Sequence, residues 1–127
     1  VNYYEQNDLP DKFFRWGGQF IIRSKTQMTP EDFEMAARSG CDNLCWGVES
    51  GSESVRAHMQ KGFSNNDLNY CMEQIHRVGM RCYFFIIVGY PTETDKDFQD
   101  TGKVKKIQSV SKKGFCEEYC YRNIVRN

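Results

Sequence analysis

The feature that most constrains the fold is an apolar segment that runs directly into a polar loop. Residues 82–88 are apolar or weakly polar throughout, and Gly89, Pro91 and Glu93 follow before a helix start. A strand that is apolar on both faces is typical of the middle of a parallel sheet covered by helices. Ligands of such sheets bind outside the carboxyl ends of the strands, so we expect a site at residues 89–93.

A second predicted strand, residues 44–48, ends in the same way. Glu49, Ser50, Gly51 and Ser52 follow it. Glycine permits a close approach of the backbone, and carboxylate and hydroxyl groups can bind a polyol such as ribose. The alternative is an ordinary turn in which Ser52 is a helix N-cap. No Gly-Lys-Ser/Thr run follows, so the segment is not a phosphate-binding loop.

Strands and helices alternate along the chain, which predicts an α/β fold with parallel strands joined through helices. Apolar residues at helical spacing, N-capping residues and terminal glycines mark the helices. The predicted strands are residues 19–23, 44–48 and 81–88, and the predicted helices are residues 29–40, 54–60, 68–79 and 94–110. The predicted inner face of the last helix consists of Phe98, Val104, Ile107 and Val110.

The two ends of the chain give weaker patterns. Residues 1–18 show no clear period, and Gly17-Gly18 is interpreted as punctuation before the first strand. Residues 111–127 become basic and irregular, so the sequence predicts no element there.

The composition is that of one domain or of a piece of one. A chain of 127 residues can bury a real core, and its 17 basic and 17 acidic residues cancel. Without a bulk electrostatic field, we expect no nucleic-acid partner. No apolar stretch reaches the roughly 18 residues that a membrane span needs, so we expect no membrane partner.

The amino terminus and the cysteines favour an intracellular protein. Residues 1–5 have neither a basic lead nor an apolar signal core, and the missing initiator Met indicates an excised or processed piece. Six cysteines could form three disulfides in a secreted protein, but Cys45, Cys71 and Cys82 fall on predicted core faces. Buried free thiols behave as small apolar groups, so we expect reduced cysteines and a cytoplasmic protein.

Two Cys-x3-Cys pairs, Cys41/Cys45 and Cys116/Cys120, raise the alternative of a metal or redox site. A tetrahedral site needs four ligands, and each pair supplies two. The first pair straddles a predicted helix end and a strand, so its thiols are expected to point differently. The second pair would share one face if it were helical. Structural or incidental cysteines are therefore favoured.

Other polar residues near the predicted edge have simple alternatives. His58 and His76 lie on predicted helices among polar neighbours, which favours exposed surface. Arg23 ends the first predicted strand at the same edge as Glu49. Its guanidinium could bind a ligand carboxylate or pair with Glu49. In the loop at residues 89–94, the alternative is that Thr94 caps a helix.

Three segments, in this order and at this spacing, resemble the radical S-adenosylmethionine (SAM) superfamily. They are residues 36–52, which end in Gly-Val-Glu-Ser-Gly-Ser, residues 59–62 (Met-Gln-Lys-Gly), and residues 85–94, which contain Gly-Tyr-Pro-Thr-Glu. The similarity is closest to the branch whose members often carry an amino-terminal cobalamin-binding domain. It spans residues 19–100, within a core of residues 19–110.

The resemblance implies a fragment of a partial or full (β/α) TIM-type barrel. It implies an enzyme that cleaves SAM reductively at a four-iron four-sulfur cluster and forms a 5′-deoxyadenosyl radical. SAM and the cluster are the implied cofactors, with cobalamin as a further cofactor in this branch. The family's Cys-x3-Cys-x2-Cys loop follows the first barrel strand. This chain is expected to begin after the second strand, so the cluster ligands are expected outside it.

The resemblance also implies roles for residues of the two loops. The end of the strand before Glu49 would contact the ribose and amino acid parts of SAM, and the end of the strand before Gly89 would flank the adenine. In the wider superfamily, the glutamate of the second loop lies one residue nearer the glycine than Glu93 does. The predicted cofactor-binding residues are Glu49, Ser50, Ser52, Arg23, Ile87, Gly89 and Glu93.

The first hypothesis is therefore a segment of a radical SAM enzyme that is inactive by itself. The alternative from another class is a noncatalytic α/β binding or assembly module that has lost the cluster. A third is a metal or redox protein that uses the cysteine pairs. Strands cut from a barrel leave open sheet edges, so we expect self-association, most simply as a symmetric dimer, beside the small-molecule cofactor.

Overall fold

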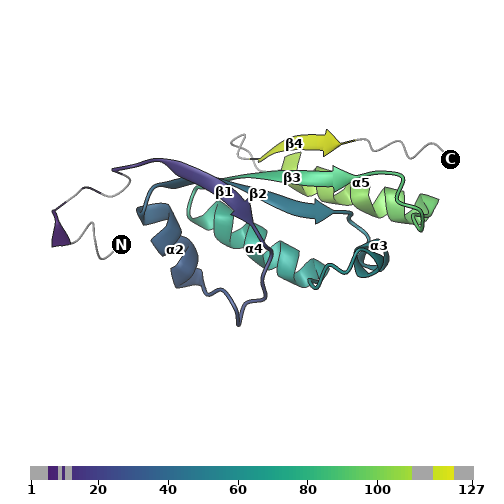
Figure 1. The fold of residues 1–127 in the computed structure, drawn as a ribbon, viewed down its shortest axis with the longest axis horizontal. Helices are drawn as coiled ribbons and strands as arrows, with labels where there is room; N and C mark the ends of the chain where they lie inside the picture. The colour runs from purple at the N-terminus through teal and green to yellow at the C-terminus, as the bar shows by residue number, and fades with distance from the viewer. Residues whose placement is uncertain (1–5, 9, 11–12, 110–115, 122–127) are drawn as a thin grey trace.

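Four parallel strands form one sheet, in the order β1-β2-β3-β4, in this computed structural model (Figure 1). The structure describes residues 6–8, 10, 13–109 and 116–121. The strands are β1 (Trp16–Phe20), β2 (Cys41–Glu49), β3 (Arg81–Ile87) and β4 (Cys116–Tyr121). The helices are α2 (Pro30–Arg38), α3 (Glu53–His58), α4 (Asn65–Arg77) and α5 (Asp95–Ser109).

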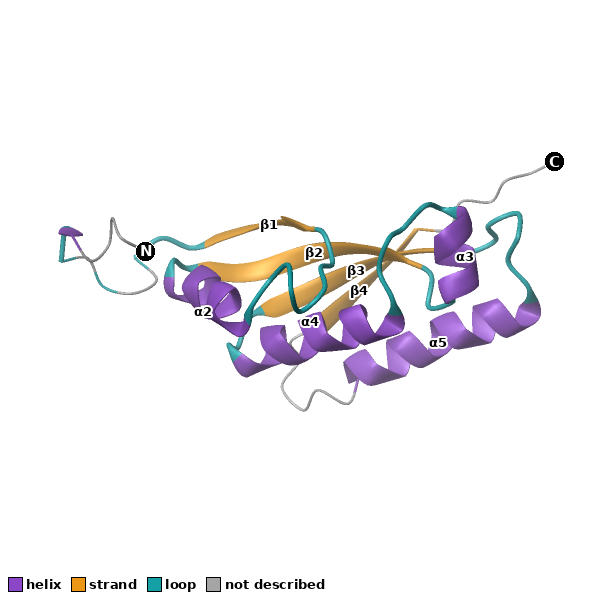
Figure 2. Ribbon diagram, turned by 90° about the horizontal axis from the view of Figure 1, so that it is seen from below, coloured by secondary structure: helices purple, strands orange, loops and turns teal. Residues whose placement is uncertain are grey.

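Each strand pairs in parallel with the next strand along the chain. The helices α2, α4 and α5 lie against the same face of the sheet, and α3 lies beyond the carboxyl ends of the strands (Figure 2). A strand order without reversal and helices on one face are the arrangement of a (β/α) barrel rather than of a doubly wound sheet. The prediction of a parallel α/β fold that is a fragment of a partial barrel is confirmed.

Both faces of β3 carry apolar side chains, but only one of them is covered by helices. Cys82, Phe84 and Ile86 are buried on the face that the helices cover. Tyr83, Phe85 and Ile87 are half-buried on the other face, which no helix of the described chain covers. In a closed barrel this second face lines the interior.

An aromatic stack forms the centre of the core. The ring centroid of Trp46 lies 5.2 Å from that of Phe20 and 5.4 Å from that of Phe84. These residues are direct partners on β1, β2 and β3, and Trp46 is fully buried. A slip of one residue would move an aromatic ring to the opposite face of the sheet. The stack therefore fixes the register of the three strands.

The ends of the helices follow local sequence signals. Thr29 and Asp32 form a capping box at the start of α2, with Pro30 at the first helical position. Gly40 and Gly79 follow α2 and α4 with φ values of 96° and 73°, in the left-handed region that glycine adopts easily. Both glycines were predicted to end these helices. None of the helices within the described residues is long and apolar enough to cross a membrane.

The first strand lies earlier than predicted. β1 covers Trp16–Phe20 instead of residues 19–23. Gly17, which we interpreted as punctuation, is inside the strand. A Cβ at this position would lie 2.4 Å from Asn43 Oδ1 on β2. The glycine makes room for the neighbouring side chain. Ile21 follows the strand and is 68% exposed.

The predicted inner face of α5 is wrong at Phe98, which is 54% exposed. Among the side chains of this helix that the structure describes, Asp97, Thr101 and Val104 are buried, so Val104 is confirmed. The inner face begins with polar side chains because they bind the loop that follows β2, as described below. The remaining predicted residues are Ile107, whose side chain lies outside the described set, and Val110, which lies outside the described residues.

A fourth strand occupies the tail, where the sequence predicted no element. β4 pairs in register with β3, from Cys82 opposite Cys116 to Ile87 opposite Tyr121. The helical arrangement considered for Cys116 and Cys120 therefore does not occur. Residues 111–115 and 122–127 lie outside the described residues.

The expectation of reduced cysteines is wrong for Cys82, which is disulfide-bonded. Cys41, Cys45 and Cys71 carry free thiols. Burial raises the pKa of the Cys41 and Cys71 thiols above the ordinary value, because the thiolate form is poorly solvated there. These two thiols therefore stay protonated and pack as small apolar groups.

The loop between β2 and α3 is clamped to α5 by buried polar contacts. Thr101 Oγ1 accepts a hydrogen bond from Gly51 N at 2.9 Å and lies 3.1 Å from Ser50 Oγ. Ser52 Oγ donates to Asp97 Oδ1 at 2.5 Å. Ser50, Ser52 and Thr101 are at most 5% exposed. Because these groups satisfy one another away from water, the end of β2 and the start of α5 behave as one unit.

Gly51→Ala is expected to lower the free energy of unfolding by about 1–3 kcal/mol, the usual cost of overpacking. A Cβ at Gly51 would lie 2.5 Å from the backbone oxygen of Asp100 and from Cα of Thr101, so α5 would have to shift. The matched control is Gly102→Ala in the same helix, where a Cβ meets nothing within 4 Å. This control should gain about 0.5–1 kcal/mol through helix propensity. Chemical denaturation measures both, and an unchanged Gly51→Ala variant would contradict the close packing.

The stability of this clamp is expected to depend on pH through Asp97. Hydrogen bonds from the side chains of Ser52 and Thr94 lower the pKa of Asp97 to about 2. The unfolded value is about 3.9, so the ionised carboxylate stabilises the fold above about pH 4 and this contribution is lost as the pH falls through about 2. Thermal melting of Asp97→Asn should be less dependent on pH in this window, whereas the exposed Asp95→Asn control should keep the dependence. A wild-type melting temperature that is constant across the window would rule the effect out.

Candidate functional site

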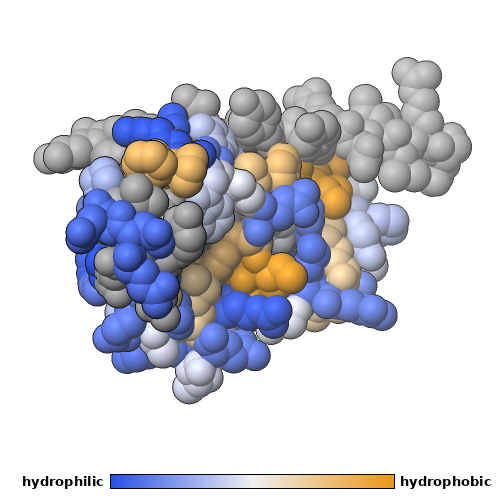
Figure 3. All heavy atoms as spheres, turned by 60° about the vertical axis from the view of Figure 1, so that its left-hand side comes forward, coloured by the Kyte–Doolittle hydropathy of each residue, from blue (hydrophilic) through white to orange (hydrophobic). Residues whose placement is uncertain are grey.

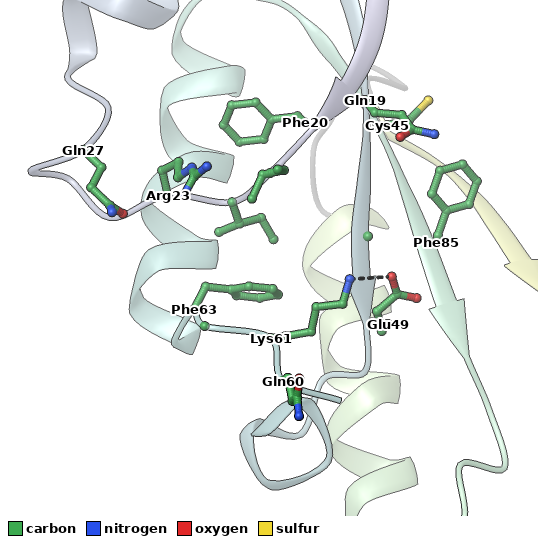
Figure 4. A pocket seen from close by; sticks show the side chains of 14 residues that line it. Gln19, Phe20, Arg23, Gln27, Cys45, Glu49, Gln60, Lys61, Phe63 and Phe85 are labelled. Atoms are coloured by element: carbon green, nitrogen blue, oxygen red, sulfur yellow. Dashed lines mark hydrogen bonds and ion pairs between the residues drawn. The ribbon is translucent and has the colours of Figure 1, made fainter. Parts of the chain in front are cut away.

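A cavity of about 460 Å³ opens at the carboxyl ends of β1 and β2 (Figure 4). Its walls come from four parts of the chain. They are residues 19–23 with Gln27, then Cys45, Gly47 and Glu49 of β2, then residues 60–63 after α3, and Phe85 of β3. Cavities of about 300–1,000 Å³ typically hold small ligands and cofactors. This edge of the sheet is where the sequence predicted a site.

An ion pair lies in the cavity. Lys61 Nζ donates to Glu49 Oε1 at 3.0 Å, and the two side chains are 36% and 17% exposed. A carboxylate offers several acceptor positions and an ammonium offers three donors, so one contact leaves both groups able to bind more. The cavity therefore presents a negative and a positive group side by side.

The backbone of Glu49 is held in an unusual conformation. The register between β2 and β3 shifts between Gly47 and Glu49, and Glu49 has φ of 64°. This left-handed conformation costs a residue other than glycine about 1–3 kcal/mol and is commonly found at functional sites. An irregularity of this kind redirects a side chain at the end of a strand. Here it turns the carboxylate of Glu49 into the cavity.

Gly47 provides the space in which the ion pair lies. A Cβ at this position would be 2.6 Å from Glu49 Oε1 and 3.4 Å from Lys61 Nζ. A larger residue would push the charged ends of both side chains away from β2. Glycine at position 47 therefore keeps the pair close to the strand.

The segment after α3 brings Lys61 and Phe63 to the cavity. The helix ends at His58, earlier than predicted, and Gln60 turns the chain with φ of 57°. The amide of Lys61 then donates to the carbonyl of Arg56 at 2.9 Å. This turn places Lys61 opposite the end of β2, and Phe63 forms the next part of the wall.

Arg23 lies across the cavity from Glu49, on the segment that follows β1 (Figure 4). It is exposed, and no carboxylate of the described residues lies within ion-pair distance of its guanidinium. The alternative in which Arg23 pairs with Glu49 is wrong, because Lys61 is the partner. Arg23 is thus available to a ligand from the opposite wall.

Ser50 and Ser52 lie outside the cavity. Both side chains are buried in the clamp between the loop and α5. Ser52 Oγ also accepts a hydrogen bond from Val55 N at 3.4 Å, so the alternative interpretation of Ser52 as an N-cap is confirmed. The two serines support the segment that carries Glu49.

The loop after β3 is closed on itself. Gly89 N donates to Glu93 Oε2 at 2.6 Å, and Gly89 has φ of 83°. Glu93 Oε1 is buried and accepts no hydrogen bond from the described residues. Neither residue lines the cavity, and Ile87 does not line it either. The structure therefore brings Arg23 and Glu49 together, and leaves the predicted residues of this loop outside.

The loop after β3 meets the end of α3 at the predicted edge. Thr92 Oγ1 of the loop after β3 lies 3.3 Å from His58 Nδ1 at the end of α3. His58 is exposed, as the sequence indicated. The contact joins the loop that follows β3 to the helix α3.

Within the described residues, no group of three or more His, Cys, Asp or Glu side chains is placed to hold a metal ion. Cys41 and Cys45 both lie in β2, so the pair does not straddle a helix end and a strand as predicted. Cys41 is nevertheless buried, whereas Cys45 lines the cavity, so the two thiols lie in different surroundings. The side chains of Cys116 and Cys120 lie outside the described set. The metal or redox alternative gains no support from the described pair.

Of the residues that line the cavity, only Arg23 and Glu49 were predicted as site residues, and three of the others show why. Lys61 belongs to the Met-Gln-Lys-Gly segment. A lysine between a short helix and a glycine at this edge of the sheet could have been predicted as a site residue. Gly47 gave a weaker signal, since glycine inside an apolar strand often marks a close approach. Phe63 had no local signal that separates a cavity wall from a core residue.

Comparison with known proteins identifies the family. The sequence model of the radical SAM superfamily matches residues 11–104. The chain is 32% identical over 71 residues to the threonylcarbamoyladenosine tRNA methylthiotransferase of Chlamydia pneumoniae, which covers 54% of this chain and 17% of that protein. It is 38% identical over 56 residues to the tRNA-2-methylthio-N(6)-dimethylallyladenosine synthase of Legionella pneumophila, which covers 42% and 12%.

A third relative is named for a bacteriochlorophyllide rather than for a tRNA. The chain is 34% identical over 89 residues to the bacteriochlorophyllide d C-12(1)-methyltransferase of Chlorobaculum tepidum, which covers 68% of this chain and 19% of that protein. The chain thus spans at most 19% of the length of these three relatives. The family match covers most of the chain and includes every wall of the cavity. On this evidence, the chain belongs to the radical SAM superfamily.

Proposed function

We propose that this chain supplies SAM-binding strands of a radical SAM enzyme, and that the cavity beside Glu49 and Lys61 takes the amino acid part of SAM. The observation that carries the proposal is the ion pair seated over Gly47 at the carboxyl end of β2. The superfamily uses SAM and a four-iron four-sulfur cluster as cofactors. The cavity at this edge is therefore a candidate binding site for SAM.

The charged groups suit the amino acid part of SAM, which carries an ammonium and a carboxylate on one carbon. Glu49 can accept hydrogen bonds from the ammonium, and Lys61 can donate to the carboxylate. Arg23 offers a second cation from the opposite wall. A ligand with both charges can replace the contacts of the ion pair one for one, which limits the cost of separating Glu49 from Lys61.

The remaining walls suit the rest of the cofactor. Phe20, Phe63 and Phe85 line the cavity and offer apolar and aromatic surface. We propose, from the family resemblance, that Ile87 and Gly89 flank the adenine at the end of the neighbouring strand. The bond from Gly89 N to Glu93 supports this role by holding the loop in one shape.

We assign Ser50 and Ser52 a supporting part in the same site. Their hydroxyl groups are engaged with Thr101 and Asp97 of α5, which holds the residue next to Glu49 in place. They would act on SAM through the position of Glu49. This differs from the direct contact that the resemblance implies.

The cluster would belong to another part of the enzyme. We expect its ligands outside this chain, in a Cys-x3-Cys-x2-Cys loop. When bound, the cluster supplies the electron for the reductive cleavage of SAM. The residues described above would bind and orient SAM, and cobalamin would be a further cofactor in the branch that the sequence resembles.

The activity of the whole protein is a wider proposal. The intact enzyme would cleave SAM reductively and begin radical chemistry on a substrate, and we expect it in the cytoplasm. The neutral charge of the chain still predicts no nucleic-acid contact by these 127 residues. Two relatives are tRNA-modifying enzymes by name, so a filter-binding assay with tRNA would test that prediction. No observation favours the noncatalytic alternative.

Glu49→Ala in the intact protein should weaken SAM binding by about 1–3 kcal/mol, the range for a lost charged hydrogen bond. Gly47→Ala should weaken it in the same direction, because its Cβ would displace the ends of Glu49 and Lys61. Isothermal titration with SAM measures the affinity, and thermal melting measures stability. Both variants should fold with little loss of stability, since the displaced groups are ends of flexible side chains.

The matched control is Glu34→Ala, which breaks the exposed ion pair of Glu34 with Arg77 away from the cavity. Its affinity for SAM should equal that of the wild-type protein. An unchanged affinity in Glu49→Ala, together with a lowered melting temperature, would mean that Glu49 and Lys61 serve the fold alone. That result would overturn the proposed site.

The isolated chain is expected to self-associate, most simply as a symmetric dimer. β1 is an edge strand, and Phe13, Phe14 and Ile21 beside it are 51%, 59% and 68% exposed. Figure 3, which brings the end of the molecule with α2 forward, shows hydrophobic side chains gathered between hydrophilic ones. An open strand edge next to exposed apolar side chains favours pairing with another chain.

Light scattering of the 127-residue chain at micromolar concentration measures this association. Phe14→Ser should shift the equilibrium towards the monomer. Phe98→Ser is the matched control, because Phe98 is 54% exposed on α5, away from β1. A monodisperse wild-type monomer of 14.9 kDa would show the prediction to be wrong.

A further inference from the structure

A fully buried arginine lies behind the cavity without lining it. Arg56 of α3 is 0% exposed. Its Nη1 donates to the carbonyl of Ser50 at 2.8 Å, and its Nη2 donates to Asn65 Oδ1 at 2.5 Å. The guanidinium carbon lies 4.8 Å from the centre of the Phe63 ring. One side chain thus joins the end of β2 to the start of α4 and to the cavity wall.

The buried charge of Arg56 is not explained by a contribution to the stability of the fold. The one carboxylate of the described residues near Arg56 belongs to Glu53, 3.7 Å away and 54% exposed, so solvent screens the pair. Nε of Arg56 is buried and has no partner among the described residues. Burying an incompletely paired charge is unfavourable, and an apolar side chain of similar size often serves a fold at least as well. Burial accordingly lowers the pKa of the Arg56 guanidinium.

The contacts of Arg56 reach the segments that carry both members of the ion pair. The carbonyl that Nη1 holds belongs to Ser50, the residue next to Glu49. The backbone carbonyl of Arg56 accepts from the amide of Lys61 at 2.9 Å. The planar guanidinium fixes the Ser50 carbonyl and the Asn65 side chain together, because its donors point along set lines in one plane. The contact with the Lys61 amide is made by the main chain and does not need the Arg56 side chain. The side chain of Arg56 therefore bears on Glu49 through Ser50, and on Lys61 through Phe63.

We propose that Arg56 is a positioning residue that sets how Glu49 and Lys61 face each other, and thereby sets the affinity of the cavity for its ligand. The inference rests on the proposed function, in which that ligand is SAM. Arg56 itself does not line the cavity. Its side chain acts through the backbone carbonyl of Ser50 and through the ring of Phe63, two residues after Lys61.

The test replaces Arg56 in the intact protein and measures SAM affinity by isothermal titration, well below the melting temperature of each variant. Arg56→Met should raise the dissociation constant of SAM about tenfold, the scale of loss when binding groups are left slightly misplaced. Arg56→Lys keeps the charge and one hydrogen bond, and should recover part of the affinity. Asn65→Ala, which removes a single acceptor, should give a smaller loss and covers the case in which Arg56→Met does not fold.

The matched control is Arg77→Met. Arg77 also joins two elements, since Nη2 donates to the carbonyl of Pro30 at 2.9 Å and Nη1 pairs with Glu34, but it lies away from the cavity. This variant should lower the melting temperature and leave the affinity for SAM unchanged. A general loss of stability would affect both arginine variants alike, whereas positioning affects binding in Arg56→Met alone.

A double-mutant comparison adds a second readout. In a Lys61→Ala background, Arg56→Met should cost less affinity than in the wild-type protein, because one of the two positioned groups is gone. Equal losses in the two backgrounds, or equal affinities of Arg56→Met and Arg77→Met, would overturn the inference and leave the proposed function intact. Absence of SAM binding by the wild-type protein would instead overturn the proposed function, and this inference with it.

Discussion

The close contact between the loop after β2 and the first turns of α5 is the constraint on which the site depends. Gly51 allows the backbones to touch, and Thr101 satisfies the polar groups that the contact buries. Water is excluded from the joint, so each hydrogen bond there must be made within the protein. The carboxyl end of β2 therefore cannot move independently of α5. This rigidity allows Glu49 to keep a backbone conformation that it would otherwise leave.

Much of the fold could be predicted because its signals are local. The apolar run at residues 82–88 and the capping residues specify a strand and helix ends over a few positions. Predictions failed where a distant contact decides. Gly17 looked like a turn residue, but it lies in β1, where the side chain of Asn43 on β2 occupies the space that a Cβ would need. Phe98 is exposed because polar contacts of Thr101 with the other loop decide which face of α5 turns inward.

The sequence was enough to predict at which edge of the sheet the site lies, but not which side chains interact there. Alternation of strands and helices was enough to place Glu49 and Arg23 at one end of the sheet. The partner of Glu49 is Lys61, because the chain turns sharply after α3. The turn is made at Gln60, which has a positive φ. A glycine there would have signalled the turn in the sequence, but a glutamine does not. Ser50 looked like a ligand residue because a hydroxyl near a strand end suits both a ligand and a buried clamp. Spacing alone cannot distinguish these two uses.

The left-handed backbone of Glu49 has a consequence for how such a protein can change. Glycine adopts φ of 64° without the penalty that glutamate bears, so a change to glycine relaxes the chain at the same step that removes the charge. Local folding energy and ligand recognition therefore oppose each other at this position. A copy released from selection for catalysis could discard the carboxylate and become easier to fold. Retention of glutamate here would then be a sign of continued use.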